Sequence, residues 1–114
     1  MIKTIKVADN FPYPGPRFRR LGPQSGEEFK YYLYEILTDF YGSGFNNNIN
    51  TRILIDLDGT RGYGSSFLEE GFGGLIRMGI PDSIIKLITI KTNEEPELED
   101  EINSYIDDAR NSIS

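Results

Sequence analysis

Residues 53–75 read ILIDLDGTRGYGSSFLEEGFGGL, and this stretch decides the expected fold. Branched aliphatic and leucine side chains dominate Thr51–Leu57, which is typical of a central strand buried on both faces. A glycine-rich turn over 58–64 follows, and the apolar spacing from Phe67 onward then predicts a helix. Strand, tight turn and helix in this order are typical of an α/β unit, so we expect a largely parallel sheet.

Two adjacent serines mark the start of that predicted helix. Ser66 and Glu69 stand at capping-box spacing, which predicts that Ser65 or Ser66 is the N-cap. A helix N-terminus also offers free N–H groups and a partial positive charge, both of which stabilise a phosphate.

Three glycines interrupt the predicted helix, at positions 71, 73 and 74. Each lowers helix stability by about 1 kcal/mol relative to alanine. We therefore expect them to permit close packing of this helix on the sheet.

The remaining elements follow from the same patterns. Strands are predicted over Met1–Ala8, Arg17–Leu21 and Lys86–Thr92. Ser25 and Glu28 form a second capping-box pair before an amphipathic helix that reaches Phe40, and an acidic helix begins near Leu98. The chain is thus predicted to be one α/β domain over residues 1–114, with a mixed, mostly parallel sheet of about four strands and three main helices.

Composition narrows the possible functions. The net charge is -6, because 18 acidic residues face 12 basic ones, which makes nucleic acid a poor partner. The basic cluster of Arg17, Arg19 and Arg20 is interpreted as a solvated surface. The sequence has no cysteine and no histidine, which excludes disulfides and cysteine–zinc sites and removes the commonest general base. No cofactor is expected.

No apolar run approaches the roughly 20 residues of a membrane span, and no signal peptide opens the sequence. The expected location is the cytoplasm.

The segment GYGSSFLEEGFGGL, residues 62–75, resembles the signature of a bacterial STAS-like domain family whose function is unassigned. The similarity runs from about Arg17 to the final helix. More distantly, the chain resembles the STAS domains of anti-sigma factor antagonists. In those domains a strand is followed by Asp-Ser-Ser-Gly at a helix start, and a GHKL-type partner kinase phosphorylates one serine, which breaks the complex.

Under this resemblance Ser66 falls on the phosphorylated serine and Ser65 on its neighbour, while Gly64 replaces the aspartate and Phe67 replaces the glycine. The resemblance implies a regulatory, non-catalytic, protein-binding module with a GHKL-type ATPase or kinase as partner. Arg61 would compensate the charge of a phosphate on Ser66. The partner-binding residues expected from this are Asp58, Arg61, Tyr63, Gly64, Phe67 and Glu70.

Other interpretations stay open. Asp56 and Asp58 face the same side of a strand, so they can bind a divalent cation, act as acid and base, or pair with Arg52 or Arg61, which we favour. The crevice at the strand end could instead serve a small-molecule or nucleotide-sensing module, although the turn lacks the P-loop ending. An enzyme built on these aspartates and Ser66 lacks a base for the serine.

Tyrosines crowd the first predicted helix. Tyr31 and Tyr34 lie off its apolar stripe. They are interpreted either as an exposed aromatic patch of the kind that marks protein interfaces or as ordinary scattered surface residues.

Overall fold

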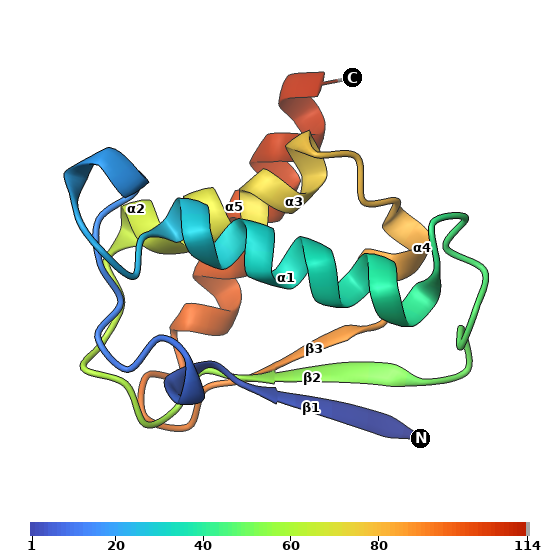
Figure 1. The fold of residues 1–114 in the computed structure, drawn as a ribbon, viewed down its shortest axis with the longest axis horizontal. Helices are drawn as coiled ribbons and strands as arrows, with labels where there is room; N and C mark the ends of the chain where they lie inside the picture. Colours follow the sequence, from blue (N-terminus) through green and yellow to red (C-terminus); the bar gives the residue numbers. More distant parts are fainter. Residues whose placement is uncertain (114) are drawn as a thin grey trace.

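The computed structural model describes residues 1–113 and contains a parallel sheet of three strands in the order β1-β2-β3 (Figure 1). The strands are β1 (Ile2–Lys6), β2 (Arg52–Asp56) and β3 (Ile88–Lys91). The predicted central position of the strand that precedes the glycine-rich turn is therefore confirmed, and so is the α/β class with a parallel sheet.

Eight helical segments accompany the sheet among the described residues. They are the 3-10 turns η1 (Val7–Asp9) and η2 (Arg19–Leu21), the α-helices α1 (Gly26–Tyr41), α2 (Ser65–Leu68), α3 (Gly74–Arg77), α4 (Asp82–Ile85) and α5 (Leu98–Ile113), and the π-helical segment η3 (Glu69–Gly73), with one of these, α2, continuing into η3 and α3. Within residues 1–113 none of these helices combines the length and apolarity that a membrane span requires.

The helices lie on one face of the sheet (Figure 1). Ile5, Ile53 and Ile55 point toward them and are buried. Thr4, Arg52 and Thr89 lie on the opposite face and are exposed. The expectation that the central strand is buried on both faces is therefore wrong, because no described element covers the second face.

The predicted strand over Arg17–Leu21 is also wrong. This segment contains η2, and the start of α1 takes up its hydrogen-bonding groups. The N–H groups of Gly26 and Glu27 donate to the carbonyl oxygens of Pro16 and Arg17, each at 2.8 Å. Carbonyls used in this way cannot join a sheet ladder, so the sheet has three strands instead of about four.

Helix α1 forms as its sequence predicts. Ser25 Oγ accepts a hydrogen bond from the Glu28 N–H at 3.1 Å, and the Glu28 carboxylate accepts one from the Ser25 N–H at 3.4 Å. The helix ends at Gly42, whose φ of 82° favours glycine. Its inner face buries four side chains one turn apart, Phe29, Leu33, Leu37 and Tyr41.

The segment η3 lies between α1 and α5 and packs on both. Its glycines allow this approach, because a Cβ on Gly71 would lie 2.5 Å from the ring of Phe29 and one on Gly74 would collide with Lys30. Close packing was expected, but these two contacts are with α1 and not with the sheet.

Candidate functional site

The turn that follows β2 is fastened to the rest of the fold by side chains at both of its ends. The Tyr63 hydroxyl donates to the carbonyl oxygen of Leu57 at 2.8 Å. The Asp58 carboxylate accepts from the N–H groups of Asn93 and Glu94 at 3.2 and 3.0 Å. The Glu94 N–H is the main reason that the pKa of Asp58 lies below its usual value, and burial raises the pKa of the Tyr63 hydroxyl. Hydrogen bonds therefore hold the turn in one position relative to β2 and to the segment after β3.

The paired aspartates are occupied by a lysine. Lys91 Nζ lies 3.4 Å from Asp56 Oδ2 and 3.5 Å from Asp58 Oδ2, and the negative charge of Asp56 is the main reason that the pKa of Lys91 is raised. The predicted pairing with Arg52 or Arg61 is wrong, since Arg52 donates to the Lys86 carbonyl instead.

The position of Lys91 also argues against the two alternatives raised from the sequence, a cation site at the aspartates and a small-molecule site at the strand end. Its ammonium group fills the space between the aspartates, where a cation or a small ligand would bind. Within residues 1–113, moreover, no cluster of three or more acidic side chains has the geometry to hold a metal ion.

Helix α2 begins one residue earlier than an N-cap at Ser65 predicts, and two residues earlier than one at Ser66. Gly64 is the N-cap, no side chain caps the helix, and Ser65 and Ser66 occupy its first two positions. The predicted capping role of the serines is therefore wrong. Glu69, the expected capping partner, instead binds Arg17 and Arg77 at 2.6 and 2.7 Å.

The two serines differ in their surroundings, although both are exposed. Ser65 lies toward Tyr105 on α5, whose hydroxyl donates to the Glu101 carboxylate at 3.1 Å and whose pKa is raised, mainly by burial. Ser66 makes no side-chain hydrogen bond to any of the residues that the structure describes. It is thus an exposed hydroxyl that neither caps the helix nor bonds to a described side chain.

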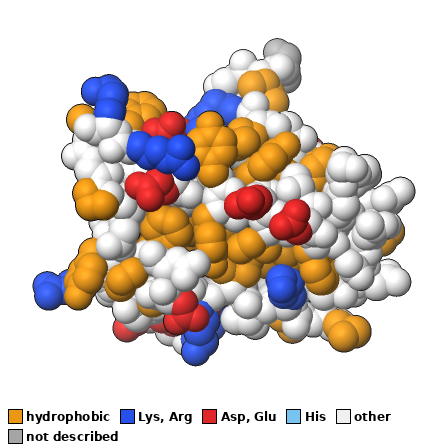
Figure 2. Space-filling model, viewed as in Figure 1, with side chains coloured by type: hydrophobic (Ala, Val, Ile, Leu, Met, Phe, Trp, Pro, Cys, Tyr) orange, Lys and Arg blue, Asp and Glu red, His pale blue; other side chains and the backbone are white. Residues whose placement is uncertain are grey.

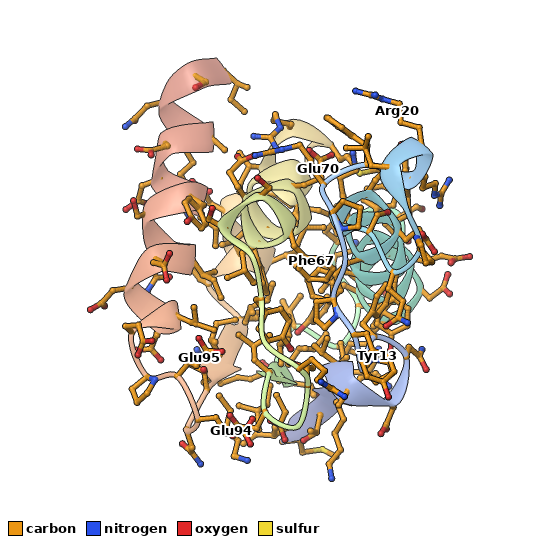
Figure 3. All side chains as sticks on the ribbon, turned by 90° about the vertical axis from the view of Figure 1, so that its left-hand side faces the viewer. Tyr13, Arg20, Phe67, Glu70, Glu94 and Glu95 are labelled. Atoms are coloured by element: carbon orange, nitrogen blue, oxygen red, sulfur yellow. The ribbon has the colours of Figure 1, made fainter. Side chains whose placement is uncertain are left out.

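Phe67, the next residue, points inward (Figure 3). Its ring stacks on Phe29 at 5.0 Å between centroids and contacts Tyr63 at 5.6 Å. Phe67 and Glu70 are both buried. Of the residues expected to contact a partner, these two instead anchor the helix, whereas Arg61 and Gly64 are exposed and Asp58 and Tyr63 are half-buried.

Arg61 is directed toward an aromatic ring that the sequence did not connect with it. Its guanidinium lies 5.6 Å from the ring centroid of Tyr13, and the backbone N–H of Arg61 donates to the carbonyl oxygen of Pro12 at 3.0 Å. Tyr13 is 59% exposed, so it adds an accessible aromatic side chain to this end of the molecule. The proline-rich loop over 11–16 gave no periodic signal that could have placed it here.

The partly buried charge cluster behind α2 was also missed. Lys30 Nζ lies 2.7 Å from Glu70 Oε2, and Arg17 lies 3.3 Å from Glu70 Oε1. Arg17 also binds Glu69, which Arg77 approaches from the other side. Arg17 was expected to be solvated, but it ties the loop before α1 to η3.

The tyrosine patch of α1 is only partly open. Tyr31 is 41% exposed, and Arg19 and Lys30 cover its ring with cations at 5.0 and 4.9 Å from the centroid. Tyr34 is half-buried.

Comparison with known protein families finds one match. Residues 45–98, slightly less than half of the chain, match the model of the STAS-like domain of unknown function (DUF4325). The matched segment contains β2, the turn, both serines, η3 and β3. The similarity expected from about Arg17 to the last helix is thus confirmed over this segment. No curated protein and no solved structure matches the chain.

Proposed function

From the STAS-like identity of residues 45–98, we propose that this chain is a non-catalytic regulatory module that binds another protein through the surface at the start of α2. This surface, called here the switch surface, consists of Tyr13, Arg61, Gly64, Ser65 and Ser66. It combines an exposed aromatic ring, an arginine and two hydroxyls on a rigid turn. Aromatic and arginine side chains are enriched where proteins bind one another.

The observation that carries the proposal is the position of Ser66. Its hydroxyl is exposed, caps nothing and bonds to no described side chain. Phosphorylation there breaks no contact of the folded chain, so its effect falls on whatever covers the surface. A phosphate adds about 1.5 to 2 negative charges. These charges weaken docking, because the partner must remove their hydration water and any acidic group on the partner is repelled by them.

The cluster behind the helix favours a phosphate on Ser66. Glu69 would repel it, but Arg17 and Arg77 neutralise that carboxylate. Arg61 becomes a counter-ion for the phosphate if it leaves the ring of Tyr13. In keeping with the resemblance to the anti-sigma factor antagonists, the proposed partner is a GHKL-type ATPase or kinase.

Affinity capture from a lysate of the native host tests the proposal. The wild-type chain should recover a GHKL-type ATPase, identified by mass spectrometry, and Ser66→Asp should recover much less of it. The matched control is Ser104→Asp, which adds the same charge at an exposed position of α5. Equal recovery by all three chains, or recovery of no partner by any, contradicts the proposed surface.

The alternative, a module that senses a small molecule in the strand-end crevice, has no comparable support. At that strand end Lys91 pairs with both Asp56 and Asp58, and the Tyr63 hydroxyl donates to the carbonyl oxygen of Leu57.

A further inference from the structure

The outer edge of β1 presents unpaired backbone groups. Within residues 1–113, β1 pairs only with β2, and the Met1 carbonyl accepts from the Arg52 N–H at 3.0 Å. In a parallel ladder the N–H and C=O of one residue point the same way and alternate along the strand. The backbone groups of Lys3 and Ile5 therefore face β2, as the Met1 carbonyl does. Those of Ile2, Thr4 and Lys6 point outward, away from the sheet. Such an edge is a template for another strand.

A groove of about 540 Å³ runs along this edge, between β1 and α1. Its apolar lining comes from Ile5 and from a stripe on α1 (Tyr32, Ile36 and Phe40), and Figure 2 shows hydrophobic side chains gathered between the two elements. An added strand would therefore find both backbone partners and an apolar wall for alternate side chains.

We propose that the occupant is the β1 strand of a second copy of this chain, paired antiparallel about a two-fold axis at Thr4. In this register Thr4 meets its own counterpart, and Ile2 meets Lys6. All outward N–H and C=O groups then have partners, because antiparallel residues in a hydrogen-bonded pair exchange both bonds. The two sheets of three strands become one continuous sheet.

The charges of the edge fit this pairing. On the helix side Lys3 meets Ile5, so no two lysines face each other directly. The groove carries Lys3 and Asp39 at one end and Lys6 and Asp9 at the other. The two-fold axis sets each end against the opposite end of the second copy, which brings Asp9 near Lys3 of that copy, whose side chain lies on the helix face as that of Ile5 does. A two-fold pair also closes on itself, unlike head-to-tail pairing of β1 with β3.

Thr4→Pro is the decisive variant, and Thr4→Val is its matched control. Proline removes the outward N–H of Thr4 and leaves every bond between β1 and β2 intact, whereas valine keeps the N–H. Sedimentation equilibrium should give the wild type and Thr4→Val twice the chain mass of 13.0 kDa. For Thr4→Pro the dissociation constant of the dimer should rise about 10- to 100-fold, since two hydrogen-bond donors are lost per dimer. Circular dichroism checks that all three fold alike.

Cross-linking tests the register independently, because the chain has no native cysteine. A short bis-maleimide should join Thr4→Cys chains into dimers. It should leave Thr89→Cys, which is exposed on the same sheet face, largely monomeric. A wild type that stays monomeric, open-ended assemblies, or equal association of Thr4→Pro and wild type would overturn the proposal. Ser66→Asp should dimerise normally, which separates this surface from the switch surface.

Discussion

Gly71 touches the ring of Phe29 so closely that no side chain fits between them. A Cβ on Gly71 would lie 2.5 Å from Phe29 Cδ2. The contact joins η3 to α1 and so sets where the helix that begins with the two serines lies over the sheet. The position of the switch surface thus depends on a glycine six residues beyond Ser65.

Gly71→Ala should therefore destabilise the fold. The expected loss is about 1 to 3 kcal/mol of unfolding free energy, because a buried aromatic ring and a helix must move apart. The control is Gly44→Ala, where the nearest atom to the new Cβ is at an ordinary 3.5 Å. Urea unfolding measures both. Equal urea midpoints for Gly71→Ala and Gly44→Ala would contradict this, because they would show that η3 can move away from Phe29 without loss of stability.

Glu70→Gln should destabilise the fold through Lys30. The Lys30 and Glu70 side chains are only 14% and 10% exposed, so removal of the carboxylate charge leaves a poorly solvated ammonium group. We expect a loss of about 2 kcal/mol, below the value for a fully buried pair. Glu99→Gln, on the exposed face of α5, should change the unfolding free energy by less than about 0.5 kcal/mol. A loss no larger than this control would mean that the ion pair adds nothing.

Glu69 should make stability depend on acid pH. The hydrogen bond from Arg77 is the main reason that the pKa of Glu69 lies below its usual 4.5. A lowered carboxylate pKa means that the unfolded chain takes up the proton first. The stabilisation is therefore present above about pH 4.5 and disappears as the pH falls further.

Glu69→Gln removes that pH dependence. The difference in unfolding free energy between wild type and Glu69→Gln should be largest near neutral pH and should shrink below pH 4.5. Denaturant titrations at a series of pH values measure it. A difference that stays constant across this range would argue against a charge effect.

Ser66→Asp should leave the fold intact. An acidic residue in the first turn of a helix is stabilising by about 0.3 to 1 kcal/mol, and the Ser66 side chain has no hydrogen bond to lose within residues 1–113. Thermal unfolding should give a melting temperature equal to or slightly above that of the wild type. A clear decrease would mean that any loss of binding by this variant reflects misfolding.

The sequence contained enough information for the parallel sheet, for α1 and for the presence of a helix after the turn, but not for the residue at which that helix begins. Local signals decide these features: the aliphatic run of β2, the pair of Ser25 and Glu28, and Gly42 at the helix end. The one-sided burial of the sheet was not predictable, because Leu54 and its neighbours look the same whether or not a second layer of helices covers them.

The candidate site was predicted less well, because its contacts join residues that are far apart in the sequence. Lys91 lies 33 residues from Asp58 along the sequence, and Arg17 lies 52 from Glu69. Spacing rules connect only neighbours, so they assigned Asp58 to nearby arginines and Glu69 to Ser66. The π-helical turn at η3 also escaped, since a helical pattern of buried residues does not reveal one extra residue in a turn.

The most direct test of the central claim is the affinity of the captured partner for the chain with and without phosphate on Ser66. Phosphoserine can be incorporated at this position during synthesis, and titration calorimetry then compares the phosphorylated and unmodified chains. The proposed switch predicts that phosphate weakens binding at least about tenfold, or 1.4 kcal/mol. Equal affinities for the two chains would contradict it and leave Ser66 as an ordinary surface residue.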